Sequence, residues 1–127
     1  MMQETRPSAV TGTPRTILCA EGGVIAAAAL IFAFSTGLSW WLLVILILAP
    51  DLSMLGYLKS ARVGTWAYNL AHTYVVPVLL LIIAWQITAP VLTHVALIWI
   101  AHIGFDRLIG YGLKYETAFR HTHLSRL

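Results

Sequence analysis

Residues 40–62, WWLLVILILAPDLSMLGYLKSAR, join a long apolar run to a basic end. Between Trp40 and Leu58 the only charged side chain is Asp51. A helix that crosses the hydrocarbon layer of a bilayer needs about 20 predominantly apolar residues, so this run is long enough to span a membrane. Lys59 and Arg62 follow directly, where such a helix would leave the lipid. The stretch therefore predicts a transmembrane helix with a basic loop at one end.

Three further apolar runs lie on either side of this one, so the predicted fold is all-α, a bundle of four transmembrane helices. The four predicted spans cover about residues 17–34, 40–58, 66–87 and 90–109. The last run is the shortest, and it reaches residue 109 only if Arg107 snorkels its charge to the interface. Pro50 and Pro77 fall inside two of the runs. Each removes a backbone hydrogen bond, which predicts a kink.

The segments outside the spans are polar. Residues 1–16 contain two prolines and no apolar periodicity, which predicts a flexible tail. Residues 110–127 mix apolar, tyrosine and basic side chains, as a short amphipathic segment at the level of the lipid headgroups does. As an alternative, the first span is a cleaved signal peptide; its apolar run is longer than usual for one, and FAFSTG is a poor cleavage site.

Composition agrees with a membrane protein and excludes a nucleic-acid partner. Of the 127 residues, 59% are hydrophobic and 10% are charged, whereas soluble domains are about half apolar and about a quarter charged. The net charge of +3 comes from lysines and arginines spread along the chain and never in a run. The expected partner is the lipid bilayer. A homo-oligomer or an association with other membrane proteins stays open.

The positions of the basic residues predict how the chain is threaded. All of them fall before the first span, between the second and third, or at or beyond the end of the fourth: Arg6, Arg15, Lys59, Arg62, Arg107, Lys114, Arg120 and Arg126. With alternating spans these positions share one face of the membrane, and the positive-inside bias makes that face cytoplasmic. Both termini, including the tail of residues 1–16, are therefore expected in the cytoplasm.

Several ionisable side chains interrupt the apolar runs, where a charge at the helix centre costs about 2.5–3.5 kcal/mol on insertion scales. His102 and Asp106 are spaced i,i+4 and share a helix face, as do Asn69 and His72 at i,i+3. With Asp51 they map to the cytoplasmic third of the spans. Glu21, Tyr111 and Lys114 are expected at the same level. The opposite half contributes Thr93, His94 and Gln86, which we expect at the interface.

Two histidines and two aspartates from three helices are sufficient ligands for a divalent metal ion. The predicted ligands are Asp51, His72, His102 and Asp106, supported by Asn69, Tyr111 and Lys114, with Glu21 or His123 as a proton carrier. Such a site would activate water for hydrolysis. The alternative is a non-catalytic membrane component, in which the same polar groups serve helix packing or association with other subunits. A transport pathway is a third option, which would need an oligomer.

Three stretches carry a resemblance to a known family: AHIGFDRLIGYGLKY at residues 101–115, FRHTHL at residues 119–124 and YNLAHTYVVP at residues 68–77. Together they resemble domain-of-unknown-function family 4260, small bacterial integral membrane proteins without an assigned activity. The resemblance implies a four-helix protein of the bacterial inner membrane and transfers no catalytic residue. In that family an acidic residue often stands where His121 is here, which makes His123 the better candidate. A fainter likeness to membrane-bound metal-dependent hydrolases is an analogy of fold only.

Overall fold

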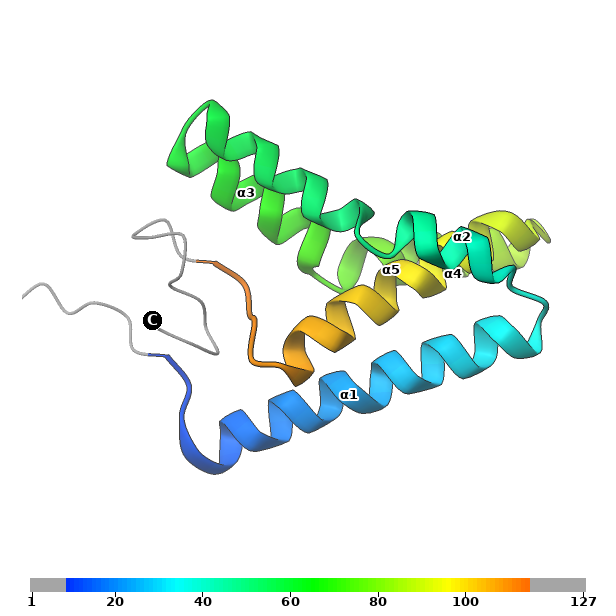
Figure 1. The fold of residues 1–127 in the computed structure, drawn as a ribbon, viewed down its shortest axis with the longest axis horizontal. Helices are drawn as coiled ribbons and strands as arrows, with labels where there is room; N and C mark the ends of the chain where they lie inside the picture. The colour runs from blue at the N-terminus through cyan, green and yellow to red at the C-terminus, as the bar shows by residue number, and fades with distance from the viewer. Residues whose placement is uncertain (1–8, 115–127) are drawn as a thin grey trace, which may run out of the picture.

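The computed structural model describes residues 9–114 as a chain of helices without strands. The elements in order are α1 (Gly12–Ser35), α2 (Trp40–Leu46), the 3₁₀ helix η1 (Ala49–Leu58), α3 (Ala61–His72), α4 (Val75–Gln86) and α5 (Pro90–Leu108). The all-α class predicted from the sequence is confirmed. Figure 1 shows the chain running back and forth: α1 in one direction, α2 with η1 back, α3 with α4 forward again, and α5 back beside α1.

Within residues 9–114, three helical segments are long and apolar enough to cross a membrane: Gly12–Ser35, Trp40–Leu58 and Pro90–Leu108. A fourth, Ala61–His72 with Val75–Gln86, passes the same test as a pair bent by 42° at a short break. The protein therefore has the helices of an integral membrane protein. The number of spans is three, or four if the bent pair crosses as one.

Two of the observed helices, α1 and α3, begin earlier than the predicted spans. The sequence predicts a tail to residue 16 and a span from residue 17, whereas α1 begins at Gly12. Pro14 is compatible with this start, because the first turn of a helix contains N–H groups that have no intrahelical partner to lose. Likewise α3 begins at Ala61 rather than residue 66, after Ser60 caps it by accepting a hydrogen bond from the backbone N–H of Val63.

Small residues bring α1 and α5 into close contact. A Cβ atom added to Gly22 would lie 2.3 Å from the Cβ of Arg107, and one added to Gly104 would lie 2.5 Å from the backbone oxygen of Gly22. Ala26 and Ala33 continue the same buried stripe along α1. Membrane helices pack through such small residues because lipid offers no hydrophobic drive for association. We call this contact the α1–α5 seam.

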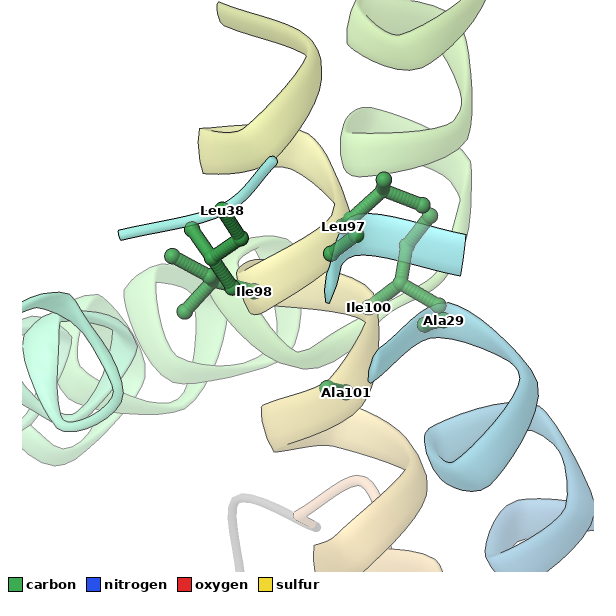
Figure 2. Close-up of a cluster of buried hydrophobic side chains, with 7 residues drawn as sticks. Ala29, Leu38, Leu97, Ile98, Ile100 and Ala101 are labelled. Atoms are coloured by element: carbon green, nitrogen blue, oxygen red, sulfur yellow. The ribbon is translucent and has the colours of Figure 1, made fainter. Parts of the chain in front are cut away.

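Beyond the glycines, the seam continues into an aliphatic cluster (Figure 2). Its labelled members are Ala29 of α1, Leu38 of the following loop, and Leu97, Ile98, Ile100 and Ala101 of α5. Ile98 is 1% exposed and Ala101 is 2% exposed, so α5 is covered on several sides at this level. α5 is therefore the central helix, and the site described below lies toward its C-terminal end.

Both interior helix breaks free backbone carbonyls beside α5. Pro50 has no N–H to donate, and η1 starts with the 3₁₀ bond from Asp51 N–H to the carbonyl of Leu48. The carbonyl of Ile47 is thereby available to another donor. The chain breaks again after His72, where Thr73 is extended and α4 restarts at Val75. His72 thus lies at the middle of its bent pair rather than in the outer third predicted from the sequence.

Candidate metal centre

Four side chains of the predicted ligand set converge in the structure: Asp51, His72, His102 and Asp106. One ligand atom from each lies within 4.8 Å of the others. Asp51 comes from the first turn of η1, His72 from the last residue of α3, and His102 with Asp106 from one face of α5. We call these four residues the His/Asp cluster. It is a group whose members are far apart in the chain and meet only because three elements pack together.

The histidine Nε2 atoms lie at the centre of the His/Asp cluster. They are 3.2 Å from each other. Nε2 of His72 lies 3.1 Å from Oδ1 of Asp51 and 3.6 Å from Oδ2 of Asp106. Nε2 of His102 lies 3.2 Å and 3.3 Å from the same two oxygens. Both nitrogens are thus within reach of both carboxylates.

The other ring nitrogen of each histidine is committed to a backbone carbonyl. Nδ1–H of His72 donates to the carbonyl of Tyr68 over 2.9 Å, and Nδ1–H of His102 donates to the carbonyl of Ile47. A carbonyl oxygen can only accept, so Nδ1 must carry the proton in each ring. In the neutral rings both Nε2 atoms therefore present lone pairs to the interior of the cluster. Metal-binding histidines are held in this way, with the distal N–H fixed by a carbonyl.

Five of the six separations match the edges of a tetrahedron around a small cation. Four ligands placed about 2.0–2.1 Å from a zinc ion in tetrahedral geometry lie about 3.3 Å from one another. The five separations that involve a histidine nitrogen run from 3.1 to 3.6 Å. Imidazole nitrogens and carboxylate oxygens are also ligand types that zinc accepts. Five of the six edges therefore fit such an ion, and the two aspartate oxygens, which form the sixth edge, lie within 4.8 Å of each other.

Access to the His/Asp cluster is one-sided. The side chains of His72 and His102 are 1% and 5% exposed, whereas those of Asp51 and Asp106 are 35% and 15% exposed. The two histidines therefore form the side of the cluster that is closed to solvent, and the two carboxylates form the side that is partly open. Water or a substrate group would reach a bound ion between the two aspartates.

Two neighbours that the sequence did not identify hold His72 in place. The ring of Tyr68 stacks on the imidazole, with centroids 3.8 Å apart and planes 11° from parallel. Arg107 donates from Nη2 to the backbone carbonyl of His72 over 3.0 Å, and from Nη1 to the carbonyl of Tyr111 over 3.2 Å. The prediction that Arg107 snorkels to the interface is wrong, because the side chain is 8% exposed and satisfies carbonyls that the helix ends leave unpaired.

The three predicted supporting residues are not ligands. They hold the segment of residues 110–114, which we call the strap, against α3 and α5. After α5, Gly110 turns the chain with a φ of +94°. Beyond this turn, the side-chain amide of Asn69, on α3, makes two hydrogen bonds to the backbone of Lys114. Its Oδ1 accepts from the Lys114 N–H over 2.7 Å, and its Nδ2 donates to the Lys114 carbonyl over 2.9 Å. Tyr111 is exposed and takes part through its backbone, accepting from Arg107.

The side chain of Lys114 ends above the aromatic ring that covers His72. Its Nζ lies 4.5 Å from the centroid of Tyr68, and the residue is 8% exposed. Burial lowers the pKa of the Lys114 ammonium to about 8 from its ordinary 10.5, although the carboxylates of Asp106 and Asp51 act in the opposite direction. Lys114 therefore remains a cation at neutral pH. The ring of Tyr68 lies between its ammonium group and the proposed ligand His72.

The remaining predicted residues lie elsewhere. Glu21 is exposed on α1 and does not belong to the His/Asp cluster. His121 and His123 lie outside the described residues. At the opposite end of the protein, Thr93 and His94 lie in the first turns of α5 and are buried against other helices, and His94 Nε2 pairs with Oγ1 of Thr36 over 3.0 Å. That contact ties α5 to the end of α1, which satisfies the imidazole without exposing it.

Comparison with known proteins identifies the family. The model of the family described as "Domain of unknown function (DUF4260)" matches residues 15–127, so this chain belongs to that family. No curated protein and no solved structure matches the chain.

Proposed function

We propose that this member of the DUF4260 family is an integral membrane protein that binds a zinc ion in the His/Asp cluster and uses it to hydrolyse a substrate. The observation that carries the proposal is the tetrahedral spacing of four ligand atoms, 3.1–3.6 Å along every edge that involves a histidine nitrogen. The carbonyl partners of both Nδ1 atoms support it, because they leave each Nε2 lone pair facing inward.

The proposed hydrolysis would take place on the side of the cluster formed by the carboxylates, which is partly open. A zinc ion held there would lower the pKa of a bound water molecule to about 7 and polarise an ester or phosphoryl oxygen. Asp51 and Asp106 would hold the ion on the side from which water enters, and a carboxylate oxygen there would accept a proton from that water. Zinc sites can expand to five ligands during reaction, so four protein ligands do not prevent entry of a substrate oxygen.

The alternative of a purely structural cluster is less well supported by the contacts. Two neutral imidazoles that point their Nε2 lone pairs at one another over 3.2 Å, with carboxylates beside them, repel each other. A cation or added protons must lie between them for the arrangement to be stable. Helix packing is also supplied elsewhere, because the α1–α5 seam brings its helices together without the His/Asp cluster.

Metal analysis of the purified protein tests the proposal. After zinc loading and removal of free ion, we expect about one zinc per wild-type chain, and a loss of affinity of about a hundredfold or more in His102→Ala and Asp106→Asn. His94→Ala is the matched control, since it removes another buried histidine of α5. Equal zinc content in wild type and His102→Ala, both folded, would overturn the proposal.

We also propose that the basic end of the bundle faces the cytoplasm of a bacterium, with the inner membrane as its location. Arg15, Lys59 and Arg62 belong to the α1 start and the η1–α3 connection, which lie at one end of the molecule in Figure 1. The positive-inside bias supports that end as cytoplasmic. In a Cys19→Ala background, Arg62→Cys should react with a thiol reagent that does not cross membranes only after the inner membrane is made permeable; reaction in intact cells would contradict this threading.

A further inference from the structure

An apolar groove of about 300 Å³ lies beside the His/Asp cluster, between η1, α3 and α5. Its wall includes Leu46, Ala49, Pro50, Ala71, Val95 and Trp99. This volume is at the lower end of the range for small-molecule sites, about 300–1,000 Å³. The lining is almost entirely hydrocarbon, so the groove suits an apolar occupant.

The groove and the His/Asp cluster share the same backbone. Pro50 directly precedes Asp51, and Ala71 directly precedes His72. Trp99 lies one turn before His102 on α5, and its Nε1–H donates to the carbonyl of Ala71. Each of the three elements that carries a ligand therefore also carries a wall residue. A molecule lying in the groove would therefore contact residues that adjoin the ligands along the chain.

Exposed apolar side chains lie next to the wall residues of the groove along the chain. Leu48, Leu52 and Leu70 flank the wall residues in sequence and are 66%, 66% and 56% exposed. In a membrane-spanning protein such side chains contact acyl chains. A lipid chain can therefore enter the groove sideways from the bilayer, without passing through water.

The charges around the His/Asp cluster select the polar end of the occupant. The two carboxylates offset the two charges of a zinc ion, and the imidazoles are neutral. The buried cations nearby are Arg107, bonded to the carbonyl of His72, and Lys114, above the ring of Tyr68. The zinc-loaded site thus carries excess positive charge, which favours an anionic group such as a phosphodiester.

We propose that the substrate is a membrane phospholipid, with one acyl chain in the groove and its phosphodiester at the His/Asp cluster. This inference rests on the proposed metal-dependent hydrolysis. In the reaction the oxygen of water forms a bond to phosphorus, and the bond from phosphorus to one alcohol oxygen breaks. One water proton ends on that alcohol, and the other ends on the new phosphate monoester. No oxidant or further co-reactant is needed.

Photocrosslinking in lipid nanodiscs tests the proposal. The zinc-loaded full chain is placed in phosphatidylcholine nanodiscs that contain phosphatidylglycerol with a diazirine on one acyl chain. We expect labelled peptides from residues 46–53, 71 and 95–99. Val95→Phe places a phenyl ring in the groove and should lower this labelling by about tenfold, because the ring occupies the space of the acyl chain. Val91→Phe, one turn earlier on an exposed position, should leave it unchanged.

The controls separate this proposal from the metal site itself. Zinc content is measured on every sample, and Val95→Phe should bind zinc as the wild type does. A zinc-loaded wild type whose groove is unlabelled would overturn the phospholipid proposal and leave the metal site standing. A diacylglycerol with the same diazirine chain should label less than phosphatidylglycerol; equal labelling would overturn the role of the phosphate. Failure of the wild type to bind zinc would overturn the proposed function.

Discussion

The α1–α5 seam and the His/Asp cluster are both buried contacts of α5, but the seam consists of glycine backbone and the cluster consists of polar side chains. At the seam, Gly22 and Gly104 have no side chain, and backbone meets backbone. At the cluster, four polar side chains meet, and their ligand atoms lie within 4.8 Å of one another. The first contact excludes any added atom, whereas the second has room at its centre for one ion.

This difference separates the residues that hold the protein together from those that give it a chemistry. Helix association in lipid depends on close van der Waals contact, so the seam is sensitive to added volume. The His/Asp cluster depends on charge, because its lone pairs and carboxylates need a cation or added protons between them. A change at the seam should therefore alter folding, and a change at the cluster should alter metal binding.

The largest effect is expected at the seam. In Gly104→Val the new Cβ would meet the backbone oxygen of Gly22 at 2.5 Å and the backbone nitrogen of Ala26 at 2.8 Å, and neither backbone atom can turn aside. We expect a destabilisation of about 3 kcal/mol or more, measured as loss of folded protein in detergent. Ala28→Val, on an exposed position of α1, is the control. A Gly104→Val protein as stable as the control would refute the close approach.

The next effect is expected from the metal. Zinc at a hundred times its dissociation constant should stabilise the wild type by about 2.7 kcal/mol through mass action. Chelation should therefore lower the melting temperature of the wild type and of His94→Ala. His102→Ala, with about a hundredfold weaker binding, should be stabilised by no more than about 0.4 kcal/mol at the same zinc concentration. A zinc-dependent rise in His102→Ala as large as that of the wild type would place the ion outside the His/Asp cluster.

A smaller effect is expected at the strap. Asn69→Ala removes the two hydrogen bonds to the backbone of Lys114, each worth about 1 kcal/mol, so we expect a loss of about 2 kcal/mol in thermal stability. Zinc content should stay at the wild-type level, because Asn69 is not a ligand. Gln86→Ala, at an exposed amide far along α4, serves as the control. Loss of zinc in Asn69→Ala would make the strap part of the metal site.

The smallest effect concerns pH. The pKa of Lys114 is lowered by burial to about 8, while in the unfolded chain it returns to about 10.5, so above pH 8 the unfolded state binds more protons. The contribution of Lys114 to stability therefore rises with pH, by on the order of 1 kcal/mol between pH 7 and pH 9. In metal-free protein, Lys114→Met should lose this rise. Lys59→Met, which removes an exposed lysine, should keep it.

Sequence patterns predicted the helices well where hydrophobicity alone decides them. The run from Trp40 to Leu58 and the run from residue 90 appear with nearly the expected bounds, since burial in lipid requires a continuous apolar stretch. The beginning of α1 was placed too late, because polar residues in a first turn resemble a tail. The prolines marked real irregularities: a break lies at Pro50, and α3 ends a few residues before Pro77.

What the sequence determined by itself was the class of protein and the identities of the four converging residues, because charged groups inside apolar runs stand out against the cost of burying them. What only the tertiary structure decided was their geometry and their support. The carbonyl of Ile47 that binds His102, the ring of Tyr68 and the buried Arg107 have no signature in the sequence. Carbonyls freed by helix breaks acquire partners only when another helix packs beside them, and no local pattern encodes that contact.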